Sequence, residues 1–172
     1  AGVLTATSLD ISGDIDVDGT SNLDVIDVDG AANFAADVTF ADGADIITAS
    51  AGTSNVRVGV NAGNSIESGG NYNTVVGDEA GTAITTGDNN VAVGYAAGDA
   101  ITTGGSNVSV GKSSLSANST GSANSALGAD ALASNTTASN NTAVGTNSLN
   151  ANTTGSENTA VGRNALDANT TA

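Results

Sequence analysis

Apolar and acidic residues alternate along the first part of the chain. In "SLDISGDIDVDG" the odd positions from Leu9 to Val17 carry Leu, Ile and Val at four of five places, while Asp occupies even positions. Side chains of a strand point alternately to opposite faces, so this pattern predicts short strands. Asp-Gly pairs such as Asp18-Gly19 and Asp29-Gly30 favour turns between them. We therefore predict an acidic, β-stranded segment over residues 1–50.

Residues 51–172 follow a different pattern, a repeat with a period of seventeen residues. It is marked by an Asn that recurs every seventeen residues from Asn73 to Asn158, with Asn55 eighteen residues before Asn73. A Gly follows each of these Asn four residues later, from Gly59 to Gly162. The repeat predicts seven coils of similar structure, and we number coil positions from the Asn as position one.

Positions two to four of each coil are typical of a short strand, so positions two and four share one face. Position four is always a branched apolar residue, which predicts that it points into the coil. These predicted core residues are Val58, Val76, Val93, Val110, Leu127, Val144 and Val161. Position three then points outward, and its small residues predict contacts with another chain. These inter-chain candidates are Val75, Ala92, Ser109, Ala126, Ala143 and Ala160.

Positions nine and twelve compensate for each other in all seven coils. Three coils combine Gly at position nine with Ile66, Ile84 or Ile101 at position twelve. The other four combine Asn at position twelve with a Leu at position nine, namely Leu115, Leu132, Leu149 and Leu166. Because a packed interior tolerates neither a void nor a double filling, both positions are predicted to fill one interior space. The Asn would then bond the loop backbone or stack on Asn of the next coil.

A stack of such coils predicts an all-β fold, a parallel β-solenoid with strands about 4.8 Å apart. One coil buries only two to four branched residues, each contributing about 2 kcal/mol. Ordering costs about 1.5 kcal/mol per residue, so a single coil cannot fold alone. So thin a core favours oligomerisation.

Composition narrows the chemistry that the chain can perform. His, Cys, Pro, Met and Trp are all absent, which removes the usual general bases, thiolates and soft-metal ligands. We therefore expect no enzymatic activity. The net charge of −15 makes binding to nucleic acid unfavourable. No stretch approaches the roughly 18 to 20 apolar residues of a membrane span, so membrane insertion is not expected.

The strands "NVAVG", "NVSVG" and "NTAVG", followed by Ala or Ser, resemble the head repeats of trimeric autotransporter adhesins, the YadA-like left-handed β-roll. The longer Asn-Thr-Thr-Gly form is similar to repeats of bacteriophage tail fibres and other virion fibres. This resemblance implies a homotrimer at a virion surface that acts as a spacer or host attachment element. Other fibre or baseplate proteins and host surface glycans would be its partners. A bacterial adhesin head at the cell surface is the alternative.

Two further patterns suggest binding functions. Asp14, Asp16, Asp18 and Gly19 match the start of a calcium loop, but position twelve of that loop is Val25 rather than Glu. The favoured interpretation is a solvated strand face, and no cofactor is expected unless calcium binds there. Thr pairs such as Thr85-Thr86 and Thr136-Thr137 recur in the coils, and a flat Thr array resembles ice-binding solenoids. Adjacent Thr point to opposite sides of a strand, which favours backbone bonding instead.

Overall fold

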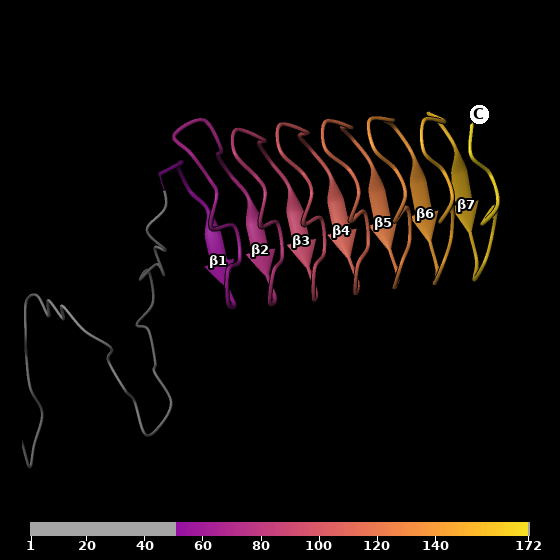
Figure 1. Cartoon of the computed structure of the whole chain (residues 1–172), viewed down its shortest axis with the longest axis horizontal. Helices are drawn as coiled ribbons and strands as arrows, with labels where there is room; N and C mark the ends of the chain where they lie inside the picture. The colour runs from indigo at the N-terminus through magenta and orange to yellow at the C-terminus, as the bar shows by residue number, and fades with distance from the viewer. Residues whose placement is uncertain (1–50, 172) are drawn as a thin grey trace, which may run out of the picture. The chain divides into compact units, whose positions relative to one another are not determined.

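The structure is a computed structural model that describes residues 51–171 as a parallel β-solenoid. It contains seven three-residue strands, with no helix among the described residues. The strands are β1 (Val56–Val58), β2 (Thr74–Val76), β3 (Val91–Val93), β4 (Val108–Val110), β5 (Ser125–Leu127), β6 (Thr142–Val144) and β7 (Thr159–Val161). They form one sheet in chain order, so six turns of the solenoid separate β1 from β7 (Figure 1). The predicted acidic segment and the calcium candidates Asp14, Asp16 and Asp18 lie outside the described residues.

Each strand pairs in parallel with the strand of the next coil, and equivalent residues stand opposite each other. Val75 pairs with Ala92, and Ala92 pairs with Ser109, each seventeen residues further on. Between β1 and β2 the step is eighteen, since Arg57 pairs with Val75. The repeat period in the sequence is therefore the register of the sheet.

The Gly at position five ends every strand because no other residue fits there. Gly77 has a φ of 134°, and a Cβ on it would lie 2.5 Å from the backbone oxygen of Gly94 in the next coil. Gly111 shows the same arrangement with a φ of 132° and with Gly128 as its neighbour. An L side chain at this position would be strained and would push the coils apart.

The Asn at position one forms a buried ladder that links successive coils. The backbone N–H of Asn90 donates to Oδ1 of Asn73 at 2.9 Å, and that of Asn107 donates to Oδ1 of Asn90 at 3.0 Å. The Asn90 side-chain amide closes its own coil by donating to the Gly104 backbone oxygen at 2.9 Å. This geometry repeats through Asn124 and Asn141. An Asn is required because its side-chain oxygen accepts a hydrogen bond from the next coil while its side-chain amide donates within its own coil.

The interior is bounded by position three on the strand and position eight on the opposite wall. In the fourth coil the Ser109 hydroxyl lies 2.7 Å from both the hydroxyl and the backbone oxygen of Ser114. In the first coil Nε of Arg57 donates to the Ala62 backbone oxygen at 2.7 Å. The two walls are therefore close enough for short side chains to meet between them.

The short distance between the two walls decides which face of each strand is buried, and it is the face opposite to the one predicted. The predicted inter-chain residues Val75, Ala92, Ser109, Ala126, Ala143 and Ala160 are all buried inside the single chain. The predicted core residues Val58, Val76, Val93, Val110, Leu127, Val144 and Val161 are instead exposed or half-buried on the outer face. Both assignments were wrong for one reason. The walls lie so close that the inward strand position takes mainly Ala and Ser, which leaves the branched residue outside.

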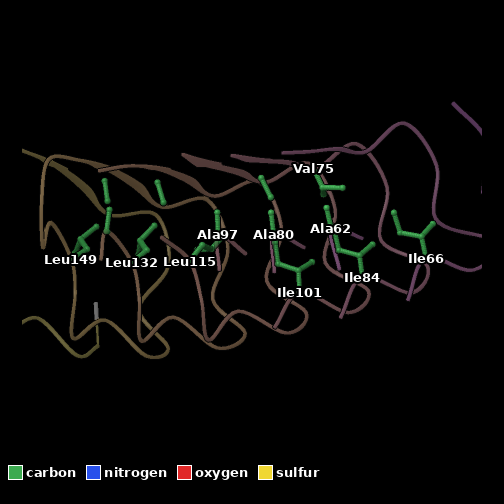
Figure 2. Close-up of a cluster of buried hydrophobic side chains, with 14 of the residues drawn as sticks. Ala62, Ile66, Val75, Ala80, Ile84, Ala97, Ile101, Leu115, Leu132 and Leu149 are labelled. Carbon is green, nitrogen blue, oxygen red and sulfur yellow. The ribbon is translucent and has the colours of Figure 1, made fainter. Parts of the chain in front are cut away.

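The compensation between positions nine and twelve agrees with the structure. Ile66, Ile84, Ile101, Leu115, Leu132 and Leu149 are all buried and follow one another inside the solenoid (Figure 2). A Cβ on Gly98 would lie 2.8 Å from Cδ1 of Ile101, and Gly63 and Gly81 meet Ile66 and Ile84 at the same distance. A Leu at position nine thus occupies the space that an Ile at position twelve fills. Leu166 differs from the prediction and is 53% exposed, because no described coil follows its own.

Where Leu fills that space, Asn at position twelve forms a second buried ladder. The side-chain amide of Asn118 donates to the Gly121 backbone oxygen at 2.9 Å. The amide of Asn135 donates to the Ala138 backbone oxygen and to Oδ1 of Asn118, both at 3.0 Å. Both predicted roles of these Asn, loop bonding and stacking, therefore occur together.

Candidate interaction surface

The outer face of the sheet is the most uniform surface of the described coils. It consists of positions two and four of each coil: Val56, Val58, Thr74, Val76, Val91, Val93, Val108, Val110, Ser125, Leu127, Thr142, Val144, Thr159 and Val161. None of these residues is charged, although the chain carries −15. Val58 is 54% exposed and Leu127 is 49% exposed. We call this surface the outer sheet face.

Two columns of residues border the outer sheet face. The leading column is the residue directly before each Asn: Ser54, Tyr72, Asn89, Ser106, Ala123, Asn140 and Glu157. The trailing column is the residue directly after each Gly: Val60, Asp78, Tyr95, Lys112, Ala129, Thr146 and Arg163. Every residue of the leading column is exposed, and so is every residue of the trailing column except the half-buried Ala129. The charged residues of these two columns are Glu157 in the leading column and Asp78, Lys112 and Arg163 in the trailing column.

Backbone hydrogen bonds hold both columns in straight rows. The N–H of Glu157 donates to the Ser139 oxygen at 3.1 Å, and the N–H of Ser106 donates to the Asp88 oxygen at 2.9 Å. Beside the trailing column, the N–H of Asp130 donates to the Lys112 oxygen at 2.9 Å. All leading residues share a left-handed conformation, with φ between 56° and 64°. Their side chains therefore leave the solenoid in equivalent directions.

The Thr pairs do not form a two-dimensional hydroxyl array. The first hydroxyl of each pair is used inside the solenoid: Thr85 Oγ1 donates to the Thr102 backbone oxygen at 3.1 Å, and Thr136 does the same to Thr153 at 3.2 Å. In every pair except the last, Thr170-Thr171, only the second residue is exposed. One hydroxyl row is a weaker basis for ice binding than the paired rows that the sequence suggested, and backbone bonding accounts for the other.

The environment of the Asp99 carboxyl shifts its pKa. Burial raises the pKa of Asp99, and the negative charge of Glu79 raises it further, while hydrogen bonds from the backbone of Asp99 and Ala100 oppose the change. Its Oδ1 is buried without a hydrogen-bond partner. Desolvation of an unsatisfied carboxylate oxygen is the main cause of the shift.

The described residues 51–171 contain no group of three or more acidic side chains arranged to hold a metal ion. None of these residues belongs to a helix long and apolar enough to cross a membrane. The surface that stands out in this part of the chain is therefore the outer sheet face with its two columns. Sequence reasoning found these rows of residues but placed the outer sheet face in the core, and it overlooked the columns.

The described part of the chain is a β-solenoid repeat protein with about seventeen residues per turn. Comparison with known protein families, with curated proteins and with solved structures finds no match.

Proposed function

We propose that the chain is a segment of a homotrimeric fibre of a bacteriophage particle, where it serves as a rigid spacer or as part of a host attachment element. The role is structural and needs no catalysis. The supporting observation is the outer sheet face, which is mainly apolar, carries no charged residue and is continuous over all seven strands. A contiguous apolar patch of a few hundred Å² on a protein surface is often a site of interaction.

Electrostatics favours this face as the place where copies meet. The described coils carry eight acidic and three basic residues, a net charge of −5, so copies repel each other where these charges lie. At positions two and four that repulsion is smallest, and burial of the branched residues stabilises contact by about 25 cal/mol per Å². The inter-chain contact predicted at position three is thereby reassigned to position four.

The attachment role and the phage setting come from the resemblance of the repeats. A fibre of this kind would join other fibre or baseplate proteins and contact host surface glycans through multivalent binding.

A charge on the outer sheet face tests the association. We expect Val144→Asp to reduce the solution mass, measured by light scattering, from three times 16.3 kDa towards the mass of one chain. The physical reason is that each trimer would bury three carboxylates in an apolar contact. The matched control is Thr137→Asp, which adds the same charge at an exposed loop position of the preceding coil. A wild-type protein that is monomeric, or a Val144→Asp variant that stays trimeric, would contradict the proposal.

A further inference from the structure

The outer sheet face is too narrow to hold copies together by itself. Seven strands at about 4.8 Å spacing and three residues at about 3.3 Å each give a strip of roughly 300 Å². Stable interfaces bury about 800 Å² per partner. Residues beside the strip must therefore take part in any stable association, and the nearest ones are the leading and trailing columns. This inference rests on the association under the proposed function.

The direction of association decides which columns meet. If copies are related by an axis parallel to the solenoid, each coil stands beside the same coil of its neighbour, and the leading column of one copy meets the trailing column of the next. If a twofold axis along the strands relates two copies instead, like columns meet and the coil order is reversed. In that second arrangement the fourth coil faces itself in full overlap, which places Lys112 opposite a second Lys112.

Charges along the columns fit the parallel arrangement. In the seventh coil Glu157 stands in the leading column and Arg163 in the trailing column, so the two opposite charges meet between copies. The other leading residues carry no charge, so no like-charged pair arises in any coil. In the second coil Tyr72 faces Asp78, which offers a hydroxyl donor to a carboxylate. A shift by one coil would lose the match between Glu157 and Arg163.

We propose that copies of this chain associate side by side, parallel and in register, with Glu157 of one copy paired to Arg163 of the next. Exposed ion pairs contribute only about 0.2–1 kcal/mol each, so this pair selects register and direction more than it adds affinity. The outer sheet face supplies the apolar contact, and the two columns decide which coil meets which.

Single cysteines can test this pairing because the chain has no Cys. Glu157→Cys and Arg163→Cys variants, carrying different tags, are co-expressed and treated with a short bismaleimide. We expect a covalent dimer of the two tags on a denaturing gel, at least fivefold more than for each variant expressed alone. The matched control pairs Glu157→Cys with Thr146→Cys, which lies one coil earlier in the trailing column. Both columns are exposed at these sites, so the substitutions leave the interior intact.

The outcomes separate this inference from the association itself. A solution mass of one chain would overturn both. A mass of several chains, with no more cross-linking for Glu157→Cys and Arg163→Cys than for the Thr146→Cys control, would overturn the in-register pairing alone.

Discussion

Side-chain size at coil position nine determines which residue is allowed at position twelve. Gly98 has a φ of 57°, and its missing Cβ leaves room for Cδ1 of Ile101. Leu132 has nearly the same backbone conformation, with a φ of 52°, and fills that room itself. Left-handed backbone costs a Leu about 1–2 kcal/mol, so the burial of Leu must exceed this cost. The two coil types are alternative ways to fill one cavity.

This equivalence predicts strong coupling between Gly98 and Ile101. Gly98→Leu alone should destabilise the fold by about 2–4 kcal/mol through overpacking and strain. Ile101→Asn alone should cost about 4 kcal/mol because it empties the interior and buries an amide. The double variant should lie within about 2 kcal/mol of wild type, since the Asn can extend the Asn118 ladder. Urea unfolding measures all three.

The result has a direct check in a coil of the other type. Leu132→Gly combined with Asn135→Ile should likewise recover most of the stability that each single change loses. Additive losses in either double variant would mean that positions nine and twelve do not share one space.

Asp99 predicts a pH dependence at the residue scale. Because burial raises its folded pKa above the unfolded value, the folded state binds its proton more tightly. Its effect on stability is therefore most favourable below the unfolded pKa, and stability falls as pH rises through the folded pKa. Asp99→Asn should be more stable than wild type to urea at pH 7, and this difference should vanish below about pH 3.5.

Asn is compatible with this site, because Asn64 and Asn150 occupy the same coil position. The matched control is Asp167→Asn, an exposed carboxyl at that position in the last coil. Asp167→Asn should show little change at either pH. An Asp99→Asn variant that gains no more than this control at pH 7 would disprove the role of burial.

The structural unit of this fold is the coil rather than the single strand. A strand of three residues has too little contact to be stable alone, and β4 and β5 hold together because the Asn ladder, the Gly turn and the interior all repeat with one period. Each coil contacts only its neighbours, so stability is a sum over coils and the contacts between them.

Removal of one whole period should therefore preserve the fold. We expect deletion of residues 124–140 to give a folded solenoid with the far-ultraviolet circular dichroism of the parent and a lower urea midpoint. Deletion of residues 124–136, which is four residues shorter than a period, should abolish cooperative unfolding because it breaks both Asn ladders. Equal behaviour of the two deletions would show that the ladders do not set the register.

At the scale of the whole molecule, the described coils form a stack whose interior is thin. The residues that face each other across it are mainly Ala and Ser, and one Leu or Ile fills the rest in every described coil except the last. Such a core provides little apolar burial, and the chain instead keeps a branched residue on the outer sheet face of every coil. Association through this face would bury the apolar area that the interior lacks, which is why the proposed function and the inferred register concern copies of the same chain.

The repeat, the strand positions, the parallel stacking and the exchange of Leu for Ile could all be predicted from the sequence. Each of these is a relation between residues at a fixed spacing, and a repeating chain displays such relations many times over. The direction of the strand faces could not. The alternation of strand side chains places Ala92 and Val93 on opposite faces of the sheet. Which of the two is buried depends on the distance to the opposite wall of the solenoid. That wall includes Ala97, which comes from another part of the coil. Only the tertiary structure sets this distance, and because it is short, the small residues lie inside and the branched residues outside.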